Sequence, residues 1–298
     1  MEEMKLQTPV QTGRSRVQLS VNEQVITLGS CFADNMGKKM EELGINALSN
    51  PFGTIYNPVS ICNSVARLAS GVPFTKDECV MMGAGAGLVC SFSHHTSFAR
   101  RTEEEFLEVA NSSLGKASAF WKSSRKVIIT LGTAWCFEHV ATGEVVSNCL
   151  KRDAKEFTRR RLRVDEVTIL LKNLVRRFPE KQFIFTVSPI RHLKDGAHGN
   201  QLSKSTLLLA IDEVTNAFPE RADYFPAYEI FMDELRDYRF YAPDMTHPSE
   251  QATEYVLSRF EEWAFPESDL PELSRRRKEL AASRHRPINF SYIRGLDV

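Results

Sequence analysis

Two strand-like runs rich in apolar residues, 126–131 (KVIITL) and 182–187 (QFIFTV), constrain the fold most strongly. Neither run alternates strictly between apolar and polar residues, which is typical of strands covered on both faces in a parallel sheet. Residues 25–28 form a similar run, and segments with apolar residues at helical spacing separate the strands. This alternation predicts an α/β protein, a three-layer α/β/α sandwich with a mainly parallel central sheet.

Further elements follow from the same patterns. Shorter strands are expected at 45–48 and 223–225. Helices are expected directly after the first strand and at 59–68, 103–114, 164–178, 202–218 and 249–263.

We expect one domain over residues 1–265, followed by a C-terminal extension over 266–298. Within the domain, 71–121 is less regular and holds the glycine-rich MGAGAG, so an insertion that covers the site is expected there. The extension carries RRRKE and few apolar residues, a pattern typical of a solvated helix face. We expect it to be loosely packed, or to contact another subunit of a homo-oligomer.

Charge and hydropathy narrow the classes of partner. The 38 Lys and Arg residues balance 38 Asp and Glu residues, so no overall field favours nucleic acid or an anionic membrane. No run approaches the roughly 18 apolar residues of a membrane-spanning helix. The N-terminal stretch resembles neither a signal peptide nor a transit peptide. A cytoplasmic protein with a local site for a small molecule is therefore expected.

The six cysteines are scattered, and no two of them form a C-x-x-C pair. This spacing predicts neither a disulfide framework nor a zinc site. We expect no metal and no cofactor.

Ser30 stands where the first strand ends and a helix begins, in the stretch ITLGSCFADNMGKKMEELG. A serine there is well placed for nucleophilic chemistry, since amides at the helix N-terminus can face a developing negative charge. It would still need a base within hydrogen-bond reach. The alternative is that Ser30 only caps the helix. Cys31 is a rival nucleophile, because a helix N-terminus lowers the pKa of a thiol; a buried structural cysteine is the other interpretation.

Asp244 and His247 lie three residues apart in PDMTHPSEQA, before the last predicted helix. This spacing can place the carboxylate beside the imidazole and leave the other ring nitrogen free as a base. The alternative is an ordinary capping arrangement at a helix start.

Nine motifs follow one another along the chain: GSCFA (29–33), NPFGTIYNP (50–58), ITLGTAWCFE (129–138), NC (148–149), AKEF (154–157), TVSPIRHLKDG (186–196), NQLSK (200–204), YFPAYEI (224–230) and ELRDYRFYAPDMTHPS (234–249). Taken together, this ordered series closely resembles the GSCFA-domain family. That family is similar to the SGNH or GDSL hydrolases, which have a three-layer α/β/α fold. The resemblance implies a serine esterase or an acyltransferase-like site.

Carried over residue by residue, the resemblance implies that Ser30 is the nucleophile, His247 the general base and Asp244 its orienting acid. Backbone amides of Ser30 and Gly53 would stabilise the oxyanion. SGNH enzymes supply a third donor from an Asn after a Gly-x, whereas this chain reads GTAW (132–135). Thr133, or Asn148 from a later turn, would have to replace that donor.

Four further residues are candidates for substrate contact: His95, Trp135, Arg191 and His192. Arg191 and His192 follow a central strand, at the edge of the sheet where α/β proteins bind ligands, and an arginine there can clamp a carboxylate or phosphate. For each candidate a structural role is the alternative: a satisfied loop histidine for His95, a core tryptophan for Trp135, and, for Arg191 and His192, a structural pair with Asp195 or another acid.

Three hypotheses result. The first is an SGNH-type hydrolase or acyltransferase that acts on a small acyl or ester substrate through an acyl-serine intermediate. The second is a non-catalytic protein that binds an acyl or sugar compound on the same fold, since the expected Asn is missing. The third is a metal-dependent hydrolase that would use His94, His95 and His192.

Overall fold

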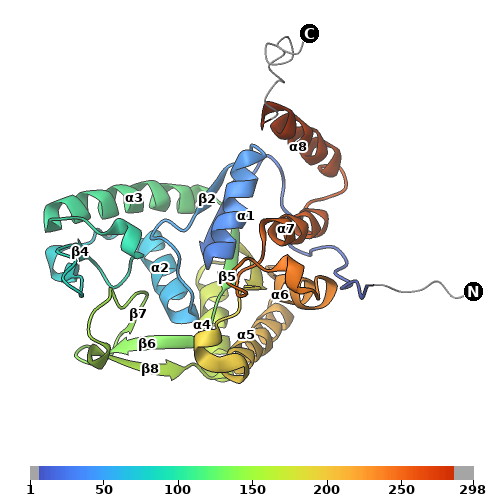
Figure 1. The fold of residues 1–298 in the computed structure, drawn as a ribbon. Helices are drawn as coiled ribbons and strands as arrows, with labels where there is room; N and C mark the ends of the chain where they lie inside the picture. The colour runs from blue at the N-terminus through green and yellow to red at the C-terminus, as the bar shows by residue number, and fades with distance from the viewer. Residues whose placement is uncertain (1–6, 285–298) are drawn as a thin grey trace, which may run out of the picture.

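Five parallel strands form the central sheet of the computed structural model, which describes residues 7–284 (Figure 1). The strands are β1 (Val25–Gly29), β2 (Ala47–Ser49), β5 (Lys126–Leu131), β9 (Gln182–Val187) and β10 (Ala222–Phe225), in the spatial order β10-β9-β5-β1-β2. The chain leaves β1 toward β2 on one side and later returns to β5 on the other. A topological switch point therefore lies between β1 and β5, and ligands of open α/β sheets bind outside the carboxyl ends of strands at such a point.

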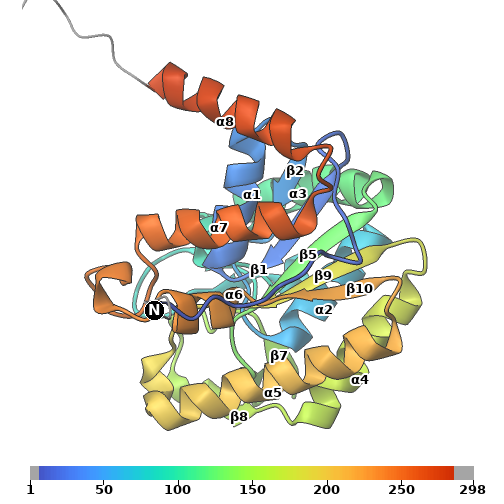
Figure 2. The same cartoon turned by 90° about the vertical axis from the view of Figure 1, so that its right-hand side faces the viewer.

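Helices cover both faces of this sheet. One face packs against α1 (Cys31–Glu42), the short α6 (Ala227–Glu229) and α7 (Glu250–Ala264). The other face packs against α2 (Pro58–Ser70), α3 (Glu103–Ser123), α4 (Val164–Arg177) and α5 (Gly196–Ala217). Figure 2 shows α7 on one side of the strands and α4 and α5 on the other. The predicted three-layer α/β/α sandwich with a parallel central sheet is confirmed.

The central strands are apolar throughout because each contributes to both cores. Ile128 and Ile184 pack on the α1 and α7 side, whereas Val127 and Phe183 pack on the side of α2 to α5. All four side chains are at most 1% exposed. Two-sided burial removes the polar alternation that a half-exposed strand would show.

The sequence patterns did not reveal two small sheets. One is antiparallel, with β6 (Trp135–His139), β7 (Val145–Val146) and β8 (Phe157–Arg161) in the order β7-β6-β8. The other pairs β3 (Val80–Met81) with β4 (Val89–Cys90). Strands of two to five residues with polar and partly exposed positions carry little periodic signal. The three-stranded sheet lies at the opposite end of the molecule from α8 (Leu270–Arg284), as Figures 1 and 2 show.

Several short helical turns complete the described chain. They are η1 (Lys76–Glu78), η2 (Thr96–Phe98), η3 (Ala154–Glu156), η4 (Leu193–Asp195), the π-helical η5 (Ile230–Glu234) and η6 (Tyr238–Phe240). Among residues 7–284, no helix is long and apolar enough to cross a membrane.

Two expectations need correction. Helix α3 continues to Ser123 rather than ending near residue 114, so the irregular part of the predicted insertion ends at Thr102. The beginning of the C-terminal extension is also better packed than expected, because Leu273 of α8 is 2% exposed. The Arg276 guanidinium donates to the carbonyls of Leu43 and Gly44, at 3.0 and 3.2 Å, and so caps the C-terminus of α1. Residues 285–298 of the extension lie outside the described residues, and its proposed contact with another subunit stays a prediction.

We predict that Gly29→Ala destabilises the fold severely. Gly29 ends β1 with a φ of +134°, and a Cβ added there would lie 2.1 Å from the Thr130 carbonyl oxygen. Backbone strain combined with this clash should lower the free energy of unfolding by about 3 kcal/mol. Urea denaturation measures the effect.

Gly115→Ala is the control for this substitution. Gly115 lies within α3, and an added Cβ would meet no atom within 4 Å. This variant should gain about 0.5–1 kcal/mol, because alanine is the better helix residue. Equal stabilities of the two variants would contradict the importance of the β1–β5 contact.

Candidate active site

Ser30 directly follows β1 and caps α1. Its backbone is extended (φ −69°, ψ 175°), and its Oγ accepts a hydrogen bond from the Phe32 amide at 3.3 Å. The side chain is buried, since Ser30 is only 1% exposed. The capping role considered from the sequence is therefore present in the structure. A cap does not exclude chemistry, because the same position faces the amides of the first helical turn.

Asn50 ties the motif that contains Ser30 to the following NPFGTIYNP motif. Its Oδ1 accepts from the Gly29 amide at 2.7 Å, and its Nδ2 donates to Asp34 Oδ1 at 2.6 Å. Asn50 itself has a left-handed backbone, with φ at +38°. One amide side chain thus joins the end of β1, the first turn of α1 and the loop after β2.

Gly53 lies in that loop, beside His95. An added Cβ at Gly53 would lie 2.3 Å from the Cβ of His95, and the φ of Gly53 is +80°, so only glycine fits here. The Gly53 amide donates to the Asn50 carbonyl at 2.7 Å. The Ser30 amide likewise donates to Thr130 O, at the longer distance of 3.2 Å. Both amides assigned to the oxyanion from the sequence are thus engaged within the protein.

The turn after β5 is held by its neighbours. The amides of Gly132 and Thr133 both donate to the Tyr56 carbonyl, at 2.9 and 3.1 Å. The Thr133 hydroxyl shares a hydrogen bond with Ser203 at 2.9 Å and accepts from the Trp135 amide at 3.1 Å. Thr133 therefore lies at the carboxyl edge of the sheet, but its side chain already has partners.

Asn148 belongs to the loop after β7. Its Oδ1 accepts from the Leu150 amide at 2.8 Å, and its own amide donates to Phe92 O at 3.3 Å. Asn148 is thus bound to the loop of Phe92, whereas the Thr133 amide is bound to Tyr56 in the loop of Gly53, so Thr133 is the more closely connected to the site.

Asp244 and His247 form the pair that their spacing suggested. His247 Nδ1 lies 2.5 Å from Asp244 Oδ2, and Asp244 Oδ1 accepts from the amides of Thr246 and His247, both at 2.9 Å. These backbone hydrogen bonds, together with the imidazole, lower the pKa of Asp244 well below its usual range. The pair is about half exposed, and Ser249 caps the following helix α7.

The loop that carries His247 is attached to the turn after β9, because the Arg191 amide donates to the Thr246 carbonyl at 3.1 Å. This contact brings the loop to the edge of the sheet at which Ser30 lies. No hydrogen bond joins Ser30 Oγ to His247, and Phe32 is the hydrogen-bond partner of the serine hydroxyl. Asp244 and His247 are thus assembled with one another but not with Ser30.

His192 is mostly buried beside the site. Its ring lies edge to face with that of Tyr56, with centroids 6.1 Å apart, and its Nε2 is buried without a partner. Burial lowers the pKa of His192 to about 4, with a smaller effect from the Lys204 ammonium, so the ring is neutral near pH 7. Its amide donates to Asn200 Oδ1 at 2.8 Å.

Asp195 and Trp135 both contact Arg159 of β8. The proposed structural pair of Arg191 with Asp195 is not formed, because Asp195 pairs with Arg159 of β8. The Arg159 guanidinium also stacks on the Trp135 ring, 4.4 Å from its centroid. The Arg191 Nε and the Trp135 Nε1 are both buried without a hydrogen-bond partner.

His94 belongs to the core rather than to the site. It is fully buried, and its ring contacts those of Phe52, Phe74, Phe98 and Phe106. Burial lowers the pKa of His94 to about 3. Among residues 7–284, no group of three His, Cys, Asp or Glu side chains is arranged to bind a metal ion.

Cys31 is half-buried rather than buried, and its environment does not activate it. Burial, followed by the nearby Asp34 carboxylate, raises the pKa of the Cys31 thiol. This is opposite to the effect expected from a helix N-terminus alone. The Cys31 thiol is therefore harder to ionise than a free cysteine.

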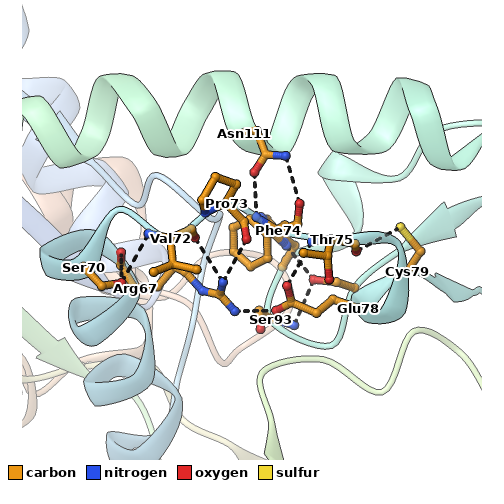
Figure 3. A network of polar contacts seen from close by, with 12 residues as sticks. Arg67, Ser70, Val72, Pro73, Phe74, Thr75, Glu78, Cys79, Ser93 and Asn111 are labelled. Carbon is orange, nitrogen blue, oxygen red and sulfur yellow. Dashed lines mark hydrogen bonds and ion pairs between the residues drawn. The ribbon is translucent and has the colours of Figure 1, made fainter.

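A cavity of about 980 Å³ is lined by none of the predicted site residues. Phe52, the neighbour of Gly53 in the sequence, forms part of its wall. The cavity lies between α2, the loops around β3 and β4, and the β6–β7 hairpin. Figure 3 shows one wall, where the Arg67 guanidinium donates to the carbonyls of Val72 and Pro73 and pairs with Glu78. Its mixed lining of Ser, Phe and charged side chains indicates no particular ligand.

Sequence reasoning missed several residues that build the site, above all Asn50, Tyr56 and Lys204. Lys204 is fully buried, and its Nζ donates to the carbonyls of Gly132 and Ser188, both at 2.7 Å. A lysine at an apolar position of a predicted helix, in the motif NQLSK, was the signal that could have indicated a buried ammonium.

The motifs described above all lie within the match to a known family model. The GSCFA family model matches residues 24–260, well over half of the chain. The chain is a member of the GSCFA family. The matched region runs from just before β1 to near the end of α7, so it includes every site element of this GSCFA protein described above.

Other comparisons add little to the family assignment. No curated protein sequence matches this GSCFA protein significantly. Among solved structures, it is similar to an acetyl xylan esterase (Est2A) from the rumen bacterium Butyrivibrio proteoclasticus, with 10% sequence identity and a TM-score of 0.38. The similarity covers 82% of this chain and 64% of the esterase, so this chain spans less than two thirds of that protein's length.

We predict that His94 makes the fold sensitive to acid. The pKa of His94 is about 3 in the folded protein, against about 6.5 when unfolded, so between these values only the unfolded chain takes up the proton. Stability that is present above pH 6.5 is therefore lost as the pH falls toward 3. At pH 5 the loss should be about 2 kcal/mol relative to pH 8.

The test is urea denaturation of wild type and His94→Leu at both pH values. Leucine cannot titrate, so the variant should lose about 2 kcal/mol less than wild type between pH 8 and pH 5. His192 is common to both proteins and cancels in the comparison. The same pH dependence in both proteins would show that His94 is protonated in the fold.

Proposed function

We propose that this GSCFA protein is an SGNH-type serine hydrolase or acyltransferase that forms an acyl-Ser30 intermediate. The observation that carries the proposal is the Asp244–His247 pair, which lies on a loop attached to the carboxyl edge of the sheet that Ser30 also occupies. Asp244 accepts from Nδ1 of the imidazole, which leaves Nε2 to accept a proton. The GSCFA resemblance implies the same three roles.

In the proposed first half-reaction, Ser30 Oγ attacks the acyl carbonyl carbon and its proton passes to His247 Nε2. The carbonyl π electrons move to the oxygen, which becomes the oxyanion. When the tetrahedral intermediate collapses, the bond to the leaving oxygen breaks, and that oxygen takes the proton from His247 to leave as an alcohol.

In the second half-reaction an acceptor hydroxyl attacks the acyl-Ser30 carbonyl and gives its proton to His247. Ser30 then leaves as the alkoxide and takes that proton back. Water as the acceptor makes the protein an esterase; a hydroxyl of another small molecule makes it an acyltransferase. The outcome depends on how well the bound acceptor excludes water.

The proposed oxyanion donors must exchange their present partners for the substrate. The Ser30 amide is the readiest of these, because its 3.2 Å hydrogen bond to Thr130 O is at the long end of the usual range, and it stands at the N-terminus of α1. The Gly53 amide has a shorter bond of 2.7 Å and is less easily released. Thr133 is the proposed third donor, ahead of Asn148.

His95, which packs on Gly53, is proposed to contact the substrate, as are Trp135, Arg191 and His192.

The proposal also requires movement. Ser30 is 1% exposed and has no hydrogen bond to His247, so substrate binding must open access to the hydroxyl and bring the imidazole to it. The loop that carries His247 can supply this movement: Met245 at its tip is 52% exposed and has a left-handed φ of +58°. Catalytic hydrogen bonds often form only in the substrate complex.

The engaged amides and the separation of Ser30 from His247 also favour a second candidate function. A protein that only binds an acyl or sugar compound would need neither a free oxyanion site nor a serine activated by a base. In that case Ser30 would remain a helix cap, and Arg191 and His192 would be polar groups of the pocket.

Covalent labelling separates the two functions. We predict that a fluorophosphonate probe labels the wild-type protein, because Ser30 Oγ attacks phosphorus, fluoride leaves and His247 takes the proton. Labelling should vanish in Ser30→Ala and persist in Cys31→Ala, as read by intact-protein mass spectrometry. An absence of label on folded wild type would favour the binding protein, and loss of label only in Cys31→Ala would identify the thiol as the nucleophile.

We predict that Asp244 acts by orienting the His247 imidazole, and not only by accepting hydrogen bonds from the Thr246 and His247 amides. Asp244→Asn keeps an oxygen for the Thr246 and His247 amides but favours the wrong imidazole tautomer, so the labelling rate should fall on the order of a hundredfold or more. Asp237→Asn is the matched control, because Asp237 is also an exposed capping aspartate, which accepts from the Arg239 amide at 2.9 Å. Similar labelling rates in the two variants would refute the role of Asp244.

A further inference from the structure

Lys204 is a fully buried cation placed between two strands at their carboxyl ends. It projects from α5, and its Nζ donates to Gly132 O and Ser188 O, both at 2.7 Å. Gly132 directly follows β5, and Ser188 directly follows β9. One ammonium therefore bridges the first carbonyls beyond two neighbouring strands.

Each of these two turns leads to a different part of the candidate site. The turn at Gly132 and Thr133 is bound to the Tyr56 carbonyl, in the loop that also holds Gly53. The turn at Ser188 continues to Arg191, whose amide holds the loop of His247. The bridge thus fixes the spacing between two turns: the turn beside the proposed oxyanion donors and the turn that holds the loop of His247.

A second buried lysine provides an internal comparison. Lys181 is 2% exposed, and its Nζ donates to Trp121 O and to Ser124 O, the latter at 2.5 Å. Trp121 and Ser124 precede β5, and Lys181 precedes β9, so this bridge joins the amino ends of the same two strands. The two lysines share burial and chemistry but lie at opposite edges of the sheet.

Burial of the Lys204 ammonium costs desolvation free energy. Burial, followed by repulsion from Arg191, lowers the pKa of Lys204 to about 7. An apolar side chain would fill the same place without that desolvation. The two carbonyls that it binds would then lose their donor, and the turns would lose their common attachment.

We propose that Lys204 is a positioning residue for the reaction at Ser30, which holds the turns after β5 and β9 at the spacing that the transition state needs. This inference rests on the proposed function. Lys204 touches no reacting atom; it acts through Gly132 and Thr133 on one side and through Arg191 and the His247 loop on the other.

The experiment compares Lys204→Met with Lys181→Met in the full chain. Both substitutions remove a buried ammonium and keep the length of the side chain, so both should lower the unfolding temperature. Hydrolysis of p-nitrophenyl acetate gives kcat and KM per folded molecule. In Lys204→Met, kcat should fall about tenfold or more with KM within about threefold, because misplaced groups weaken the transition state more than the bound ester. In Lys181→Met, kcat should stay within about twofold.

Hydrogen exchange tests the bridge independently of activity. Peptides covering 130–136 and 186–193 should exchange faster in Lys204→Met than in wild type and should be unchanged in Lys181→Met.

Wild-type kcat in folded Lys204→Met overturns the inference, as does unchanged exchange in both peptides. If wild type itself neither hydrolyses the ester nor takes the fluorophosphonate label, the proposed function fails, and exchange alone decides whether Lys204 holds the turns. If Lys204→Met does not fold, Lys204→Gln replaces it: its shorter side chain cannot bridge both carbonyls, so the same loss of kcat and faster exchange are expected, and wild-type values overturn the inference.

Discussion

The site depends on how closely β1 and β5 approach one another at their carboxyl ends. Gly29 lies against the Thr130 carbonyl with no room for a side chain, and the amide of the next residue, Ser30, donates to that same carbonyl. Since these strands flank the topological switch point, the chain diverges in opposite directions beyond them. Ser30 caps α1 at this point of the sheet edge.

Hydrogen bonds between loops maintain this edge. Asn50 links the end of β1 to the loop after β2, Tyr56 O holds the turn after β5, and Lys204 joins that turn to the one after β9. The Arg191 amide then attaches the loop of His247. Each loop is therefore bound to its neighbour, and the arrangement of the site belongs to the edge as a whole rather than to any single motif.

Burial sets the charge state of the groups around Ser30. His192 is neutral near pH 7 and the Cys31 thiol is harder to ionise, both chiefly because they are removed from water. Asp244, in contrast, is exposed and ionised, and its carboxylate is held by backbone amides. Beside His247 the structure therefore holds an ionised carboxylate, whereas the buried imidazole of His192 is uncharged.

By itself, the sequence determined the layers of the fold and the places of Ser30, Asp244 and His247. Continuous apolar strands are typical of burial on both faces, and the contact between Asp244 and His247 spans only three residues of the chain. The tertiary structure alone decided the partners of Gly53, Thr133 and Arg191, and the burial of Lys204. Those contacts join residues far apart in the chain, and their hydrogen bonds depend on where the loops meet, which no local pattern encodes.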